Sequence, residues 1–322
     1  MSTYYQIFGG KINVVSSDPS NPVRGQTWYN STTGNLKYAQ TLLTASWATG
    51  GNLGTGRLAL GGAGTQTAGL AFGGQGPVNI TEEYDGSAWT AGGNLATGRG
   101  YLAGAGTQTL GLAIGGQTTV VTNATEEYDG SAWTAGGNLA TARKSLGGAG
   151  IQTLGLAFGG ILTPPGVNLS NATEEYSGTA WTAGGNLATA RRYLGGAGTQ
   201  TLGLAFGGVT TTYSAATEEY DGSVWTAGGN LVTARGYFAG CGTQTAGLAF
   251  GGLNAVGISS ATEEYNGTSW ISTGNLISGK FYVAGAGTQT AGLAIGGGPT
   301  GAPNTQEYFP PGTVIPKTVT LL

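Results

Sequence analysis

A repeat with a period of about 42 to 48 residues makes up most of this chain, and a period in this range is typical of the blades of a β-propeller. One copy, residues 173–208, contains a glutamate pair, a tyrosine, a tryptophan, an arginine and a final diglycine. A diglycine follows each repeat tryptophan at a constant spacing, and these tryptophans stand at Trp47, Trp89, Trp133, Trp181, Trp225 and Trp270. The repeat therefore limits what the chain can fold into.

Each repeat is predicted to form four short strands. In the copy that follows Arg191, the first strand is expected at about 193–198 and the second at 202–206, joined by a Thr-Gln-Thr turn. The third is expected over 217–220 and the fourth around Trp225. Asp221-Gly222 suggests a two-residue type I′ hairpin turn, which needs positive φ at both central positions. No segment shows a convincing helical period of apolar residues.

The landmarks at the two ends of the repeat array predict a closed ring. Trp47 comes before the first complete unit, and Tyr308 has no tryptophan after it. If the strand near Trp47 pairs with the strand near Tyr308, a sixth blade is completed and exposed sheet edges are limited. We therefore expect an all-β chain whose residues 41–310 form a six-bladed β-propeller, preceded by a short N-terminal β-hairpin extension.

The repeat resembles the kelch family. The resemblance rests on the diglycine after an apolar strand, the Glu-Tyr-Asp-Gly run, the tryptophan five positions after the tyrosine, and Asn-Leu-Ala-Thr-Ala-Arg before the next first strand. It departs from familiar kelch repeats in having Asn-Leu where a proline-containing turn is usual, and in its high glycine and alanine content. The resemblance implies a β-propeller and no single activity, because kelch propellers include adhesive, scaffolding and enzymatic members.

Residues 1–40 lie outside the repeat. Residues 22–38 are predicted to form a hairpin around an Asn-Ser-Thr-Thr-Gly turn. This stretch resembles a short module near the start of many tailed-phage virion proteins, including tail fibres, which implies attachment to other virion proteins. The alternative is a plug or cap on one propeller face. Trp28 and Tyr29 are candidates for a contact surface, and residues 311–322 are expected to be a short C-terminal tail.

Composition excludes several functions. The 322 residues carry a net charge of −3, only 8% are charged and there is no basic tract, so we expect no nucleic-acid partner. No apolar run reaches the length of about 18 residues that a membrane-spanning helix needs, so no membrane span is expected. The chain has no histidine, the commonest general base and metal ligand, and no calcium-loop pattern, so we expect no metal and no cofactor. The single cysteine, Cys241, stands where other repeats have alanine and is expected to be a buried small residue.

The charged and aromatic repeat residues favour structural roles. Adjacent strand residues point to opposite faces, so the glutamate pairs are not acid/base dyads. One glutamate of each pair is expected to meet the arginine before a first strand, with Lys280 replacing it in the sixth unit; the arginines are Arg57, Arg99, Arg143, Arg191 and Arg235. Six equivalent acids provide no differentiated glycosidase pair. Tryptophans at equivalent positions are expected to pack between sheets, although sugar stacking is the alternative.

The repeats differ mainly between the diglycine and the next glutamate pair. These loops should share one face with the connections between repeats, while the Thr-Gln-Thr turns lie on the other face. A variable surface on a constant scaffold is where binding residues are expected. The candidate binding residues on this face are Thr163, Pro164, Pro165, Asn168, Thr211, Tyr213 and Asn254.

These features together predict a non-enzymatic phage virion protein. We expect a tail-fibre or tail-tip propeller, located in the virion, that attaches by its N-terminal segment and meets a glycan or protein of the host surface. The alternative from another class is a lectin-like or scaffolding bacterial kelch protein. A carbohydrate-active enzyme is the third hypothesis, which the missing histidine and the equivalent acids disfavour.

Overall fold

The computed structural model describes residues 4–7, 10–162, 168–299 and 301–319, and these form strands, turns and loops without a helix. The chain divides into two compact units, and each is considered by itself. The smaller unit contains Met1–Ser46 and Phe309–Leu322, and the larger contains Trp47–Tyr308. No helix among the described residues is long and apolar enough to cross a membrane.

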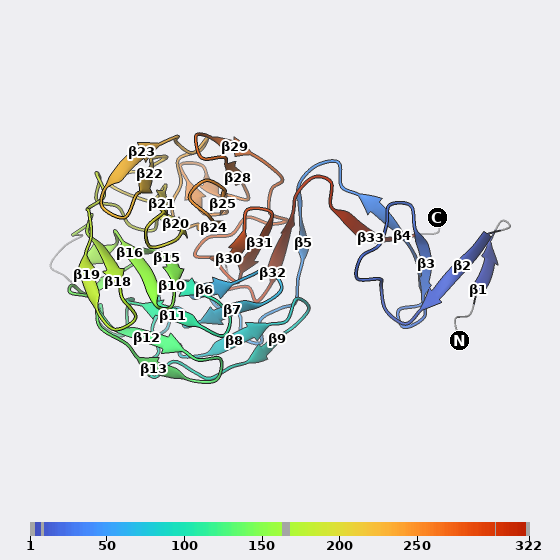
Figure 1. Cartoon of the computed structure of the whole chain (residues 1–322), viewed down its shortest axis with the longest axis horizontal. Coiled ribbons are helices and arrows are strands. Elements are labelled where there is room, and N and C mark those ends of the chain that lie inside the picture. Colours follow the sequence, from blue (N-terminus) through green and yellow to red (C-terminus); the bar gives the residue numbers. More distant parts are fainter. Residues whose placement is uncertain (1–3, 8–9, 163–167, 300, 320–322) are drawn as a thin grey trace. The chain divides into compact units, whose positions relative to one another are not determined.

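The larger unit is propeller-like, with repeated four-stranded sheets arranged around a common centre (Figure 1). Five of the sheets that the described residues form each take four strands in order from one stretch of the sequence, and their pairings are antiparallel. In two of these five, β17 or the β26–β27 ribbon lies between the second and third strands in the sequence. The remaining sheet has the order β30-β31-β32-β5, so its outer strand comes from the start of the repeat array.

The strands of these sheets, in spatial order, are β6(Gly61–Gly64), β7(Gly69–Phe72), β8(Thr81–Tyr84), β9(Trp89–Ala91); β10(Ala103–Gly106), β11(Gly111–Ile114), β12(Thr125–Tyr128), β13(Trp133–Ala135); β15(Gly147–Ile151), β16(Leu154–Phe158), β18(Thr173–Tyr176), β19(Trp181–Ala183); β20(Gly195–Gly198), β21(Gly203–Phe206), β22(Thr217–Tyr220), β23(Trp225–Gly228); β24(Ala239–Gly242), β25(Gly247–Phe250), β28(Thr262–Tyr265), β29(Trp270–Ser272); and β30(Ala284–Thr288), β31(Ala291–Ile295), β32(Thr305–Phe309), β5(Ser46–Thr49). Two small ribbons pair β14(Arg143–Lys144) with β17(Ile161–Leu162), and β26(Leu253–Asn254) with β27(Gly257–Ile258).

The first strand of each sheet lies nearest the centre and contacts the first strands of its neighbours, with β30 also against β6. The first strands consist mainly of glycine and alanine because they lie so close to one another. A Cβ at Gly104 would clash with the backbone oxygen of Gly62 on the neighbouring strand. Only glycine allows such a close approach of two backbones, so the high glycine content belongs to the packing of these inner strands.

The last four residues of each second strand are buried, because a neighbouring sheet covers each of their faces. In β7, Leu70 and Phe72 pack with Tyr128 and Trp133 of the following sheet, whereas Ala71 packs toward Leu293 and Ile295 of the sheet that contains β30. Leu70, Ala71 and Phe72 are all 0% exposed. This two-sided burial explains the continuous apolar run of these strands.

The hairpin between the third and fourth strands differs from the expected type I′ turn. Gly222 has a φ of 91°, but Asp221 does not have positive φ. The backbone N–H of Asp221 donates to the carbonyl of Val224, so Gly222 and Ser223 are the central residues. Positive φ at the first central position alone is the pattern of a type II′ turn.

The smaller unit is a five-stranded sheet with the order β1-β2-β3-β4-β33. Its strands are β1(Tyr4–Ile7), β2(Gly10–Val15), β3(Thr27–Asn30), β4(Asn35–Thr41) and β33(Val314–Thr318). β3 and β4 form the hairpin that the sequence suggested, and β2 pairs with β3 in parallel. The C-terminal residues expected to be a tail supply β33, which pairs with β4.

Trp28 is fully buried in this smaller unit. It is 0% exposed, and its indole N–H donates to Oδ1 of Asp18 at 3.1 Å. Lys37 forms an ion pair with the other oxygen of Asp18 at 2.6 Å, and Asn30 donates to Oδ1. Trp28 therefore packs the interior of the smaller unit and does not present the contact surface proposed for it. Tyr29, the next residue, is half-buried.

Candidate functional site

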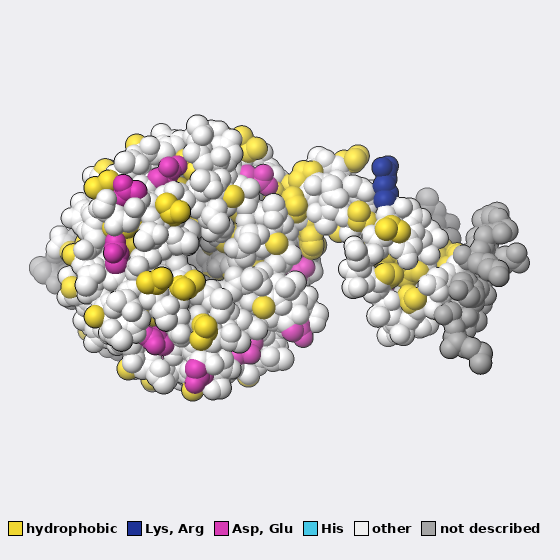
Figure 2. All heavy atoms as spheres, viewed as in Figure 1, with side chains coloured by type: hydrophobic (Ala, Val, Ile, Leu, Met, Phe, Trp, Pro, Cys, Tyr) yellow, Lys and Arg dark blue, Asp and Glu magenta, His cyan; other side chains and the backbone are white. Residues whose placement is uncertain are grey.

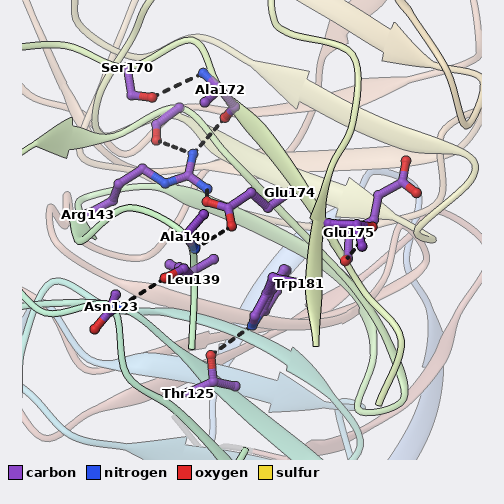
Figure 3. Close-up of polar contacts among 12 residues, drawn as sticks. Asn123, Thr125, Leu139, Ala140, Arg143, Ser170, Ala172, Glu174, Glu175 and Trp181 are labelled. Carbon is purple, nitrogen blue, oxygen red and sulfur yellow. Dashed lines mark hydrogen bonds and ion pairs between the residues drawn. The ribbon is translucent and has the colours of Figure 1, made fainter. Parts of the chain in front are cut away.

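The buried arginines hold the third strand of their own sheet. Figure 3 shows Arg143, whose Nη2 lies 2.7 Å from Oε1 of Glu174, with 0% and 7% of the two side chains exposed. Its Nη1 donates to the carbonyls of Gly159 and Ala172. The other carboxylate oxygen accepts the backbone N–H of Ala140. Burial lowers the pKa of Arg143, and Glu174 opposes that effect.

The same ion pair occurs in five sheets, at 2.5 to 3.2 Å, and involves Arg57–Glu82, Arg99–Glu126, Arg143–Glu174, Arg191–Glu218 and Arg235–Glu263. The sixth sheet has Lys280 and Gln306 instead. The Lys280 ammonium donates to the carbonyl of Gly296 and to Asn304, and it is 1% exposed. Burial without a carboxylate partner lowers the pKa of Lys280 to about 8.

The second glutamate of each pair connects neighbouring sheets. Tyr128 donates its hydroxyl to Glu83 of the preceding sheet, and burial followed by this hydrogen bond raises the pKa of Tyr128 to about 12. Tyr84 donates in the same way to Glu307, which links the sheet of β6 to the sheet of β30. The remaining pairs are Tyr176–Glu127, Tyr220–Glu175, Tyr265–Glu219 and Tyr308–Glu264.

The tryptophans form a second link between sheets. Each indole N–H donates to a buried threonine of the preceding sheet at 2.9 Å, and the pairs are Trp47–Thr262, Trp89–Thr305, Trp133–Thr81, Trp181–Thr125, Trp225–Thr173 and Trp270–Thr217. Every one of these tryptophans is at most 9% exposed. Their rings are packed inside, as the structural interpretation expects, and are not displayed for sugar stacking.

The glutamine of each Thr-Gln-Thr turn forms a third link. Gln108 donates to the carbonyls of Gly69 and Tyr84 in the preceding sheet. Gln66 binds Gly292 and Tyr308 in the same way, again across the first and last repeats. These hydrogen bonds already use the repeated polar side chains within the protein. A ligand would therefore have to bind other residues.

The predicted binding residues are partly brought together. Thr211 and Tyr213 line a cavity of about 490 Å³, together with Thr212, Tyr237 and Ala255. Asn254, next to Ala255, uses its side-chain oxygen to accept the backbone N–H groups of Val256 and Gly257. Asn168 is exposed, and its carbonyl accepts the N–H of Leu162. Thr163, Pro164 and Pro165 lie outside the described residues.

A ring of six residues just before the inner strands was not anticipated from the sequence. These residues have φ between 52° and 62°, and they are Ala59, Tyr101, Ser145, Tyr193, Tyr237 and Tyr282. Each N–H donates to the carbonyl of the equivalent residue in the preceding repeat, including Ala59 to Tyr282, at 2.8 to 3.0 Å. Left-handed φ is strained for residues other than glycine, and such strain is concentrated at functional sites.

The tyrosines of this ring form an aromatic cluster. The rings of Tyr193 and Tyr237 stack with centroids 3.9 Å apart, and Tyr282 contacts both edge-on. Burial raises the pKa of Tyr237 and of Tyr282, so both hydroxyls are protonated at neutral pH. The sequence feature that could have indicated this ring is the residue two places after each buried cation, which varies between Tyr, Ala and Ser within otherwise uniform repeats.

Figure 2 shows one face of the larger unit, with hydrophobic side chains around a central hollow and acidic side chains farther out. Exposed hydrophobic residues at the Thr-Gln-Thr turn positions include Leu110, Ile151, Leu154 and Leu202, each about half exposed. No group of three or more Cys, Asp or Glu residues suited to a metal ion occurs among the described residues.

No family model matches the chain, and no curated protein matches it significantly.

Proposed function

We propose that the larger unit is a closed six-bladed β-propeller of kelch-like type, with β5 as the outer strand of its last blade. Three observations support closure. The sheets of β30 and β6 share the tyrosine–glutamate and glutamine–backbone contacts found between other neighbours. Trp89 binds Thr305 across the same junction. The ring of backbone hydrogen bonds also returns from Ala59 to Tyr282.

We propose that the chain is a non-enzymatic recognition protein of a tailed-phage virion, part of the tail fibre or tail tip. In this proposal the smaller unit contacts other virion proteins, and the propeller meets a glycan or protein of the host surface. The observation that carries the recognition role is the cavity lined by Thr211, Tyr213 and Tyr237, formed by loops that differ between repeats. The phage assignment rests on the resemblance of residues 22–38.

A lectin-like or scaffolding role in a bacterial cell is the second candidate, because the same loop cavity would serve it. The two candidates differ in where the protein is found. Purified phage particles should contain the chain in the first case, and its absence from them would leave only the second. Catalysis is disfavoured because the repeated glutamates are held by arginine or tyrosine.

The recognition role is tested by whole-cell binding of the full chain. Thr211→Ala/Tyr213→Ala removes two cavity-lining side chains and leaves the buried Val209, which anchors the loop to Arg192, in place. We expect binding to fall at least tenfold. Val224→Ala, at an exposed hairpin position of the same sheet, is the matched control and should bind as the unmodified chain does. Equal binding by both variants would contradict a site in this cavity.

A further inference from the structure

The ring of left-handed residues surrounds a small cavity at the centre of the larger unit. This cavity has a volume of about 90 Å³ and is lined by the ring residues and the buried residues that follow them. Its walls are partly aromatic and otherwise mostly aliphatic, because four of the six ring positions hold tyrosine and the residues that follow the ring positions are mostly leucine. A cavity of this size accommodates one small chemical group and not a whole sugar ring.

Ser145, like Ala59, leaves a gap in this aromatic ring, and Ser145 is the one of the two with a polar side chain. Its side chain is 7% exposed, and its hydroxyl is buried without a hydrogen-bond partner. A buried hydroxyl without a partner costs free energy, so such a group needs an explanation, and a ligand that it binds is one. Tyr101 and Tyr193 occupy the ring positions on its two sides.

Two basic side chains lie over the tyrosines on either side of Ser145. Lys144 and Arg192 are the basic residues of the larger unit that stand outside the positions of the buried arginines and Lys280. The Lys144 ammonium lies 5.5 Å from the ring centroid of Tyr101, and the Arg192 guanidinium lies 5.4 Å from that of Tyr193. Gln117 accepts one of the three N–H donors of Lys144. Nε of Arg192 is buried and has no hydrogen-bond partner.

The central cavity and the larger loop cavity share one lining residue. Tyr237 lines both, so a ligand could place one group at Ser145 and extend over Tyr213 and the threonines. Neither lining contains an aspartate or glutamate. Lys144 and Arg192 also lie outside both linings, against Tyr101 and Tyr193, which line the central cavity. Aromatic faces and hydroxyl groups in one cavity suit a polyhydroxylated ligand, and the two cations add a preference for negative charge.

We propose that this combined site binds an acidic glycan, with its anionic group held between Lys144 and Arg192 and a small substituent in the gap at Ser145. The inference rests on the proposed recognition function and deepens it by naming the ligand class. The anionic group is a carboxylate or a phosphate. Both share the chemistry that lysine and arginine recognise, so the experiment uses probes of both kinds.

The test measures binding of the full chain to oligogalacturonate, to an N-acetylneuraminate trimer and to poly(glycerol phosphate). Methyl-esterified oligogalacturonate is the neutral counterpart, because it keeps the backbone and masks the charge. We expect at least one acidic probe to bind at least tenfold more tightly than the neutral one. Lys144→Gln/Arg192→Gln should remove this preference. Arg24→Gln, an exposed change in the smaller unit, should not alter it.

Ser145→Tyr tests the gap itself. Four equivalent positions hold tyrosine at the same left-handed φ, so the variant should fold, which its thermal unfolding would show. We expect it to fill the central cavity and lower acidic-glycan affinity at least tenfold. Unchanged affinity in this variant would remove the central cavity from the site.

The proposal is overturned if every acidic probe binds no more tightly than the neutral one, or if neutralising both cations changes nothing. Preference for a carboxylated or a phosphorylated probe upholds it and identifies the anionic group. Cell binding that persists without any acidic preference would leave the recognition function standing and remove this inference. Acidic-glycan binding by a chain that does not bind cells would uphold this inference and remove the proposed recognition of the cell surface.

Discussion

Replacing Glu174 by glutamine is the sharpest test of how the repeat is held together. The change keeps the size of the side chain but removes the charge that faces Arg143, whose side chain is 0% exposed. An amide oxygen can still accept the N–H of Ala140, as Gln306 accepts that of Ile277 in the sixth sheet. The guanidinium, however, would remain buried without a carboxylate.

Removing one partner of a buried ion pair costs about 3–5 kcal/mol. Arg143 keeps its hydrogen bonds to the carbonyls of Gly159 and Ala172, so we expect the lower end, about 3 kcal/mol. The measurement is the free energy of unfolding from denaturant titration followed by tryptophan fluorescence. Glu175→Gln is the control in the same strand, because it weakens only the bond from Tyr220 and should cost about 1 kcal/mol.

The sixth sheet provides a natural replacement for the pair. Arg143→Lys/Ala172→Asn/Glu174→Gln copies Lys280, Asn304 and Gln306 into the third repeat. Because an ammonium is satisfied there by carbonyl and amide oxygens, we expect the triple variant to recover at least half of the loss caused by Glu174→Gln alone. The reasoning is refuted if Glu174→Gln costs less than about 1 kcal/mol, or if the triple variant is less stable than the single one.

Three further predictions concern Trp47, Lys280 and Gly104. Trp47→Ala should lower the free energy of unfolding by about 3–5 kcal/mol, as much as Trp181→Ala within the array, and a much smaller loss would argue against closure by β5. Lys280→Met should have a larger free energy of unfolding than the unmodified chain at pH 7.5. In denaturant titrations, this difference should shrink by about 2 kcal/mol between pH 7.5 and pH 9.5. The reason is that Lys280 has a pKa near 10.5 in the unfolded chain and keeps its proton over this range, whereas in the folded protein its pKa is about 8 and it loses the proton. A stability difference independent of pH would contradict the burial of a charged Lys280. Gly104→Ala should cost about 1–3 kcal/mol in a denaturant titration, because its Cβ would meet the Gly62 oxygen, and a neutral effect would show that the inner strands can move apart.

Much of the repeated architecture could be predicted from the sequence because one local pattern is copied many times. The third strand, expected over 217–220 from the repeated Thr-Glu-Glu-Tyr, occurs at those residues. The partner of each arginine could also be predicted, since a fixed basic position and a fixed acid in an otherwise apolar repeat leave few alternatives. The sheet topology then brings the two together in five sheets.

The left-handed ring could not be predicted in this way. The sequence suggested a first strand from Tyr193, but β20 begins at Gly195 because Tyr193 has a φ of 53°. Tyrosine has no local preference for that conformation. It is imposed by the hydrogen bond from Tyr193 to Ser145 in the preceding repeat, which depends on the packing of separate sheets.

The interpretation of Trp28 was wrong for a related reason. An aromatic residue outside the repeat suggested a contact surface, but Trp28 is 0% exposed, its indole binds Asp18, and its strand pairs with β4. β4 is in turn covered at its edge by β33, which comes from the opposite end of the chain, after the whole repeat array. A pattern read over one short stretch of sequence contains no information about such a distant partner.

The position of the candidate ligand site also follows from how the repeats share their polar groups. The first glutamates bind arginines, the second glutamates bind tyrosines, and the turn glutamines bind backbone carbonyls, all at equivalent positions around the larger unit. A site built from those residues would be repeated, and each copy would be occupied by the protein itself. A distinct site therefore requires positions where repeats differ without breaking these links. Lys144, Ser145 and Arg192 meet that condition, because other repeats hold glycine, leucine, phenylalanine, alanine or tyrosine there and keep the same backbone hydrogen bonds.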